Sequence, residues 1–480
     1  MLIEELESLV KKVQALKSES NQIELKAACQ GAPKIYDTLS SFSNQTGGGI
    51  ILFGIDEQSD YQLCGVYDAA DLQKKVSEQC LQMDPPVRAL CTATKIDGKA
   101  VVSAEIQEIE MARRPCYYKG KGPNQGSYIR VGDADRKMTE YEVYSYEAYR
   151  KKIQDELRIV DRATQADIQT RYLDDYLVRL SVAKPNLAAL SKERQLRLQG
   201  FCINGAPTLA GIELFSDYPQ SFFPRLCITA VVVPGTEMGD TADNGARFID
   251  NTTIEGTLPQ MLAGALSFVR RNMSVQTIID RDTGERKDRT EYPVMAVREI
   301  LLNALIHRDY SIHTETAPIT VVMYRNRMVV ENPGGLYGRL TIDTLGTVSA
   351  DTRNPFIAGA MEIENETENR FSGIPTIRKE MKAYHLPEPV FENERGTFRV
   401  ILYNSALEIK EKPTRSLEEA ILHFCCRPRT REDLAQEFSH ITKTYLMTGY
   451  VNPLVERGML LLSLPDKPRS RHQQFTTRTL

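Results

Sequence analysis

Basic and aromatic side chains that alternate in the first third of the chain are the first residues whose chemistry suggests a function. Lysine and arginine can neutralise phosphates and tyrosine rings can stack on bases, so this mixture suits nucleic-acid binding. The basic residues are Arg113, Arg114, Lys119, Lys121, Arg130, Arg136 and Lys137, and the tyrosines are Tyr117, Tyr118 and Tyr128. The alternative is an ordinary solvated surface, which charged runs usually form.

A second basic group lies in the last 66 residues, which contain ten Lys or Arg against seven Asp or Glu. Lys443 falls at the start of an expected helix, where a recognition helix presents side chains to the major groove of DNA. Lys467, Arg469 and Arg471 crowd the tip of an expected hairpin. These positions predict a DNA-binding surface near the C-terminus.

Apolar periodicity places these C-terminal cations on a winged helix. Thr430 is a plausible N-cap, and Gly458 ends a helical pattern. The expected helices are 417–424, 431–438 and 444–457, and the expected strands are 459–464 and 474–477. Three helices followed by a hairpin are typical of the winged-helix variant of helix-turn-helix. A winged helix can also contact protein or support dimerisation, so that alternative stays open.

The elements that must position the first basic group form an α/β domain. Residues 1–17 have helical spacing, and the run 50–55 is continuously apolar and β-branched, as in a buried strand. Asp97-Gly98 predicts the turn of a hairpin. Gly47-Gly48-Gly49 would let a phosphate approach the backbone closely, but it equally suits a tight turn.

Bulk properties limit the class of protein. At 480 residues the chain is too long for one hydrophobic core, so roughly two to four domains are expected. The nine cysteines contain no CxxC pair, which favours reduced thiols and predicts no structural metal. Because no apolar run is long enough for a bilayer and the N-terminus lacks signal-peptide features, we expect a cytoplasmic protein that binds no membrane. The net charge of −4 excludes a uniformly basic coat but allows local patches.

Three separated blocks, ESNQIELKAACQ, IYDTLSSFSNQTGGGIILFGIDEQSDYQLCGV and GSYIRVGDADRKMT, closely resemble the Schlafen AlbA-type domain. The resemblance covers about residues 15–150 and implies a nucleic-acid-binding module. Some relatives of this class are nucleases, and Glu19, Glu24 and Asp56 could hold Mg²⁺ for phosphodiester cleavage. Alternatively, Glu24 pairs with a lysine and Asp56 begins a turn.

Four later blocks, AVREILLNALIHRDYS, VVENPGGL, RFSGIPTIRKEM and LPEPVFENERGTFRVIL, resemble the RecG-C-terminal-like region of prokaryotic regulators, a divergent relative of GHKL ATP-binding domains. The resemblance covers about residues 200–404. It implies no helicase, and the chain lacks a GxxxxGK[ST] loop for P-loop hydrolysis.

The GHKL likeness implies an ATP and Mg²⁺ site. Glu299 and Asn303 lie four apart on one helix, so the carboxylate could activate water while the amide oxygen holds Mg²⁺. Three glycines could let the backbone approach the nucleotide: Gly334, Gly335 and Gly373. Two positions depart from the family pattern, since Glu331 stands where an adenine-binding Asp is expected and Pro333 interrupts the glycines. His307 receives no role in chemistry.

Together these observations predict an α/β (α+β) multidomain protein. The expected parts are a Schlafen AlbA-like domain over 1–155, linker helices and a GHKL-like α/β sandwich over 156–409, and a winged helix over 415–480. The leading hypothesis is a homo-oligomeric, DNA- or RNA-binding transcriptional regulator. The alternatives are a Mg²⁺-dependent nuclease and a nucleotide-binding assembly protein whose winged helix contacts protein.

Replacing Lys467, Arg469 and Arg471 together by alanine should weaken DNA binding. Each neutralised phosphate releases condensed counterion, so the log–log salt dependence should flatten by roughly 2 to 3 units. Base preference should persist, because phosphate contacts do not read sequence. Salt titrations of both proteins, with folding checked by circular dichroism, measure the effect. Unchanged affinity and slope would favour the protein-contact reading.

Overall fold

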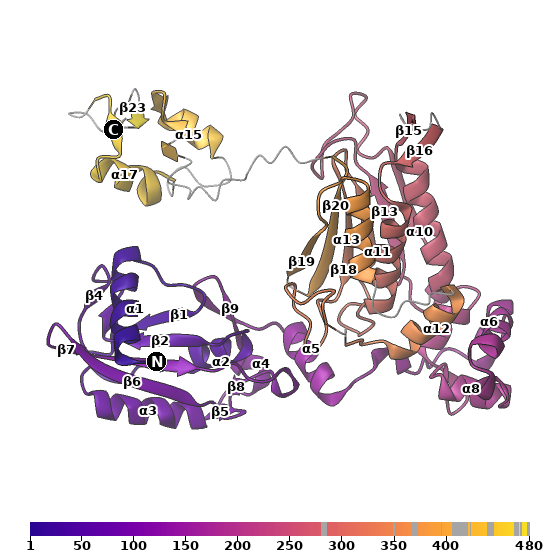
Figure 1. The fold of residues 1–480 in the computed structure, drawn as a ribbon, viewed down its shortest axis with the longest axis horizontal. Helices are drawn as coiled ribbons and strands as arrows, with labels where there is room; N and C mark the ends of the chain where they lie inside the picture. Colours follow the sequence, from indigo (N-terminus) through magenta and orange to yellow (C-terminus); the bar gives the residue numbers. More distant parts are fainter. Residues whose placement is uncertain are drawn as a thin grey trace. The chain divides into compact units, whose positions relative to one another are not determined.

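The computed structural model divides the chain into two units, Met1–Ser405 and Ala406–Leu480 (Figure 1). The structure describes residues 1–279, 286–348, 351–365, 373–394, 396–405, 421–422, 424–438, 446–464, 470 and 473–477. The architecture is mixed α/β, as the sequence predicts. Among the described residues, no helix has both the length and the apolar character needed to cross a membrane.

The first sheet has the order β1-β2-β7-β6, formed by β1 (Ile23–Lys26), β2 (Gly49–Phe53), β7 (Lys99–Ile106) and β6 (Ala89–Ile96). Because side chains alternate between the faces of a strand, Ile51 and Phe53 enter one core while Leu52 enters another. Helix α1 (Ile3–Leu16) covers the Leu52 face, and α2 (Tyr36–Asn44) and α3 (Ala69–Leu81) cover the opposite face. The sheet is therefore sandwiched between helices.

The glycine cluster before β2 serves backbone geometry. Gly47 and Gly48 have positive φ angles of 81° and 66°. A Cβ at Gly48 would collide with the carbonyl oxygen of Ile106, and one at Gly49 would lie 2.6 Å from the ring of Phe42. These contacts favour the tight-turn interpretation over a phosphate site.

Short elements complete the first 151 residues. The hairpin expected at Asp97-Gly98 joins β6 to β7. Helix α5 begins after Thr139, which forms a capping box with Glu142. The remaining elements are β3 (Ile55–Asp56), β4 (Gln62–Leu63), β5 (Met83–Asp84), β8 (Tyr117–Tyr118), α4 (Pro123–Gly126), β9 (Tyr128–Val131), β10 (Ala134–Lys137) and α5 (Glu140–Lys151).

A helical segment precedes the second large sheet and shares its core. Tyr176, Phe201 and Phe215 pack ring against ring there. Its elements are α6 (Arg171–Ala183), α7 (Pro185–Ala188), α8 (Lys192–Leu198), β11 (Cys202–Ile203), β12 (Ala206–Pro207) and α9 (Leu209–Phe215).

The second sheet has six strands in the order β14-β13-β17-β18-β20-β19. They are β14 (Asp250–Ile254), β13 (Ile228–Val232), β17 (Ile319–Met323), β18 (Arg327–Pro333), β20 (Thr397–Tyr403) and β19 (Val390–Glu394). Four helices share its core, α10 (Leu258–Asn272), α11 (Val294–His307), α12 (Pro355–Asn365) and α13 (Gly373–Ala383), and a hairpin of β15 (Val275–Ile279) and β16 (Arg286–Thr290) lies between α10 and α11. Helix α11 is central, since eight of its residues are buried.

The second unit contains β21 (Arg429–Thr430), α15 (Arg431–Glu437), a π-helical turn (Met447–Val451), α17 (Asn452–Glu456), β22 (Leu460–Leu462) and β23 (Gln474–Thr477). Thr430 caps α15, its hydroxyl accepting a hydrogen bond from the Asp433 backbone. The strands pair in the order β21-β23-β22. Most of the expected helix 417–424, together with Lys443, Lys467, Arg469 and Arg471, lies outside the described residues, so the winged helix stays a prediction.

One buried acid makes the stability of the first unit depend on pH. Glu213 on α9 is completely buried, and within the described part of the chain neither carboxylate oxygen has a hydrogen-bond donor. Burial raises the pKa of Glu213 to about 8, although Arg308 opposes the rise. The folded state therefore favours the neutral acid at neutral pH.

The stability of the wild type should fall as the pH rises from about 4.5 to about 8, because only the unfolded chain ionises Glu213 readily in that window. Glu213→Gln keeps a neutral side chain of the same shape. Its free energy of unfolding relative to the wild type should therefore increase by about 1 to 2 kcal/mol between about pH 6 and pH 8. Urea titrations at both pH values measure this, and a pH-independent difference would contradict it.

Candidate functional site: a pocket along helix α11

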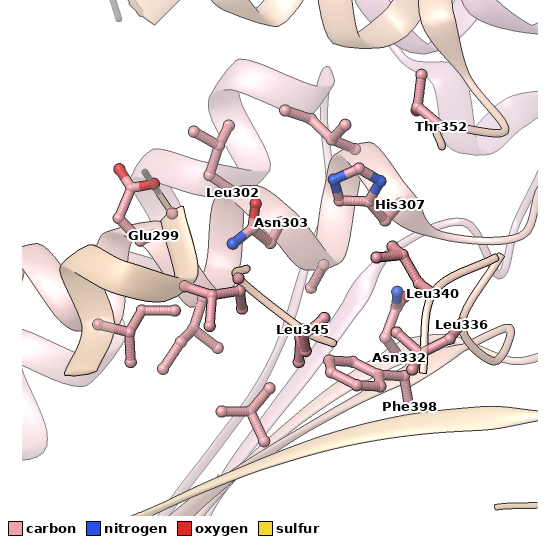
Figure 2. Close-up of a pocket in the computed structure, with 18 of the residues that line it drawn as sticks. Glu299, Leu302, Asn303, His307, Asn332, Leu336, Leu340, Leu345, Thr352 and Phe398 are labelled. Atoms are coloured by element: carbon pink, nitrogen blue, oxygen red, sulfur yellow. The ribbon is translucent and has the colours of Figure 1, made fainter. Parts of the chain in front are cut away.

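A pocket of about 890 Å³ lies between α11, β18, β20 and the start of α13. Glu299, Asn303 and His307 line it from successive turns of α11, because residues four apart share one face of a helix (Figure 2). The rest of α11 is mostly apolar and buried. The helix thus holds a short polar row against the cavity while its other faces fix it in the core.

Glycines form the opposite parts of the wall. Gly334 and Gly335 follow β18, and a Cβ at Gly334 would lie 2.6 Å from Asp309 Cβ. Gly373 begins α13, where a Cβ would lie 3.0 Å from Asn303 Nδ2 and 3.5 Å from Glu299 Oε2. The structure therefore brings all five residues expected to bind nucleotide into one pocket. Whether they bind one stays a prediction.

Burial controls the charges inside the pocket. It raises the pKa of the Glu299 carboxyl, while Arg298, 3.2 Å away, opposes the rise. Burial, with the nearby charge of Arg353, lowers the pKa of His307 to about 4. His307 is thus a neutral imidazole at neutral pH and can donate or accept a hydrogen bond without adding charge.

The residue that faces the pocket at the end of β18 is Asn332 and not Glu331. Glu331 pairs with Arg399 at 2.8 Å and does not line the cavity. Asn332 lines it, is only 4% exposed, and its Oδ1 has no hydrogen-bond partner in the described residues. The family pattern predicts the adenine contact at Glu331, but side chains alternate along a strand, so Asn332 faces the pocket and Glu331 does not.

A buried ion pair supports the turn at Gly334 and Gly335, and the sequence analysis did not predict this pair. Asp309 Oδ2 lies 2.5 Å from Arg353 Nη1, and the side chains of Asp309 and Arg353 are 4% and 8% exposed. Arg353 lines the pocket and donates to the Gly335 carbonyl at 2.7 Å. Burial alone would raise the pKa of Asp309, but Arg353 together with hydrogen bonds from Tyr141 and Ser311 outweighs burial and holds that pKa below its usual range. A sequence signal for this pair exists, because Asp309 is a charged residue within the family-like block AVREILLNALIHRDYS, directly after His307 and Arg308.

The three candidate nuclease carboxylates do not come together. Glu19 and Glu24 both lie beside Arg130, at 3.7 Å and 2.7 Å. Asp56 instead accepts hydrogen bonds from Gln58 and Ser59 in the turn after β3. Burial raises the pKa of Glu19 to about 7. Within the described residues, no group of three or more acidic, Cys or His side chains could hold a metal ion.

Two of the candidate nucleic-acid contacts are structural. The Arg130 side chain is 1% exposed and pairs with Glu24 and Asp135. Arg114 is buried and donates to the backbone of Asn44 and Ile109 at 2.7 and 2.8 Å. Neither guanidinium can reach a phosphate without breaking these contacts, so Arg114 and Arg130 are excluded from the predicted nucleic-acid-binding surface. The remaining candidates are exposed: Arg113, Lys119, Lys121, Arg136 and Lys137.

Two families match the chain. Residues 19–139 match the family Schlafen, AlbA_2. Residues 316–402 match HATPase_c_4, described as Putative ATP-dependent DNA helicase recG C-terminal. The chain contains a Schlafen AlbA_2 domain and a RecG C-terminal-like domain. The second match includes Gly334, Gly335 and Gly373 but begins after α11, so Glu299 and Asn303 lie outside it although they line the same pocket.

Solved structures and curated proteins add little to the two domain matches. The DIP2311 protein from Corynebacterium diphtheriae is 17% identical, with a TM-score of 0.41, over 99% of this chain and 97% of that chain. The N-terminal domain of Putative ATP-dependent DNA Helicase RecG-related Protein from Nitrosomonas europaea is 25% identical, with a TM-score of 0.23, over 28% of this chain and 92% of that chain. None of the curated proteins compared with the chain matches it.

Replacing Arg130 by alanine should destabilise the AlbA_2 domain by about 3 kcal/mol, because Asp135 would lose its cation and Glu24 would keep only Lys26. The matched control is Arg136→Ala on the neighbouring strand β10, an exposed position where the loss should stay within about 0.5 kcal/mol. Urea denaturation of both variants measures the difference. Equal stabilities would show that Arg130 is not structural.

Proposed function

We propose that this chain is a nucleic-acid-binding transcriptional regulator whose RecG C-terminal-like domain binds an adenine nucleotide with Mg²⁺. The observation that carries the proposal is the pocket, which gathers Glu299, Asn303 and three glycines from separate segments. Its volume lies within the range of about 300 to 1,000 Å³ usual for small-molecule sites. The family match to HATPase_c_4 over residues 316–402 supports the same ligand class.

The residues present suit a nucleotide. Asn303 offers a neutral amide oxygen, a ligand type that Mg²⁺ accepts, and Glu299 lies one turn away on the same face. Gly334, Gly335 and Gly373 bring backbone into the pocket wall at positions where a Cβ would crowd neighbouring side chains. At the end of β18, the buried Asn332 Oδ1 has no hydrogen-bond partner among the described residues and could accept a hydrogen bond from an amino group of a base.

Nucleic-acid binding is proposed for the AlbA_2 domain and the C-terminal unit. Five candidate cations of the AlbA_2 domain are exposed, and Lys121 lies 5.9 Å from the ring centre of Tyr128. Where a cation lies beside an aromatic ring, the cation can bind a phosphate while the ring stacks on a base. Glu19 and Glu24 share Arg130, and the described residues contain no group of three side chains that could hold a metal ion. These carboxylates offer no support for the nuclease alternative, so binding is the function proposed here.

Asn303→Ala should abolish stabilisation by Mg-ATP. A ligand that binds only the folded state stabilises it by mass action, by about 2.7 kcal/mol at a hundredfold excess over Kd. The wild type should therefore melt a few degrees higher with millimolar Mg-ATP, and Asn303→Ala should not. Glu331→Gln, beside the pocket but outside its lining, is the matched control and should respond like the wild type. No shift of the wild type at millimolar Mg-ATP would refute nucleotide binding.

A further inference from the structure

Helix α5 begins where the AlbA_2 match ends, and it contacts the wall of the nucleotide pocket. Tyr141 donates a hydrogen bond from its hydroxyl to Asp309 Oδ2 at 2.7 Å. Asp309 in turn holds Arg353, which lines the pocket. Burial raises the pKa of Tyr141, so its hydroxyl stays protonated and remains a donor to the aspartate.

The Tyr141 ring also packs against Gly396, a turn residue directly before β20. A Cβ on Gly396 would collide with the ring, so a glycine is needed there for the tyrosine to fit. The Gly334 backbone donates to the Gly396 carbonyl at 2.8 Å. Tyr141 therefore touches both supports of Gly334, which are the Asp309–Arg353 pair and the backbone of Gly396.

Two turns further along α5, Tyr149 contacts another part of the same wall. Its hydroxyl donates to Asp351 Oδ2 at 3.2 Å, and its ring lies edge-on to Tyr337 with 5.4 Å between centroids. Asp351 and Tyr337 both line the pocket. A Cβ on Gly338 would lie 2.7 Å from the Tyr149 ring. The helix thus rests against the pocket wall at two points.

The same helix is attached to the AlbA_2 domain. Tyr146 lies beside the Arg114 guanidinium, which opposes the rise that burial causes in the pKa of Tyr146. Arg114 donates to the Asn44 carbonyl at 2.7 Å, and the Asn44 amide donates to the Tyr128 carbonyl at 3.1 Å. Tyr128 lies next to the exposed Lys121. Hydrogen bonds of Arg114 and Asn44 therefore link the surroundings of Tyr146 to the basic and aromatic surface.

We propose that Tyr141 and Tyr149 are positioning residues of the nucleotide pocket, and that through α5 nucleotide binding and nucleic-acid binding by the AlbA_2 domain are thermodynamically coupled. The inference rests on the proposed function. A nucleotide that contacts Gly334, Gly335 or Arg353 changes the surroundings of Tyr141, because the ion pair and the glycine backbone lie between the ligand and the tyrosine. A ligand that favours one position of α5 then favours one arrangement of Arg114 and Asn44.

Coupling of this kind is reciprocal. If the nucleotide changes the affinity for nucleic acid by some factor, nucleic acid must change the affinity for nucleotide by the same factor. Couplings between sites are typically about 5- to 150-fold. A merely structural role for the tyrosines would lower stability without giving this matched pair of changes.

The experiment measures the Kd of the full chain for a mixed-sequence labelled oligonucleotide by fluorescence anisotropy, with and without saturating Mg²⁺ and a non-hydrolysable ATP analogue. The Kd for the analogue is measured by calorimetry with and without the oligonucleotide. The wild type should show equal reciprocal changes of at least about fivefold. Tyr141→Phe and Tyr149→Phe should each reduce the factor, and the double variant should bring it close to one. Phenylalanine keeps the ring packing, so the variants should fold.

Tyr144→Phe is the matched control, because that hydroxyl on the same helix bonds Asp155 at 2.7 Å, and neither Tyr144 nor Asp155 lines the pocket. It should keep the wild-type coupling factor. If both ligands bind the wild type with affinities that do not depend on each other, the coupling is overturned and the proposed function stands. If either ligand fails to bind alone, the proposed function is overturned together with the coupling. A factor that persists in the double variant would overturn the role of the two tyrosines.

Discussion

The buried ion pair between Asp309 and Arg353 is the interaction on which the pocket depends. Burying two charges carries a desolvation penalty that their attraction offsets only when further hydrogen bonds satisfy the remaining polar atoms. Here Asp309 also accepts from Tyr141 and from the Ser311 backbone, and Arg353 also donates to the Gly335 carbonyl. One pair therefore ties together the end of α11, the glycine turn after β18, the approach to α12 and helix α5.

The position of α11 explains why that pair can organise a binding site. Most of the helix is apolar and buried in the large core, so it cannot rotate without exposing leucine and isoleucine side chains. Glu299, Asn303 and His307 are consequently held along one row facing the cavity (Figure 2). Burial in turn shifts the pKa values of the two titratable members of this row. It lowers the pKa of His307, which stays neutral, and raises the pKa of Glu299.

The AlbA_2 domain uses part of its positive charge for its own fold. Arg130 is enclosed by Glu24 and Asp135, and Arg114 satisfies backbone carbonyls around Asn44. Removing either cation would take a hydrogen-bond donor away from buried carbonyls or carboxylates, so both arginines support the fold. Only the exposed cations can exchange counterions with a nucleic acid, so the surface proposed for binding is smaller than the basic composition suggests.

The mixed α/β class, the AlbA_2 and RecG C-terminal-like segments, and the buried strand β2 could be predicted from the sequence, because apolar periodicity and separated motifs are local features of the chain. The sequence also selected Glu299, Asn303 and Gly373, which the structure brings together. Which side chains are buried, and which residues they contact, depends on tertiary packing. It turned Asn332 and not Glu331 into the pocket, enclosed Arg130 in carboxylates, and placed Tyr141 against an aspartate 168 positions away. Such contacts join distant segments through burial and charge, and neither spacing nor composition encodes which partner a side chain will find.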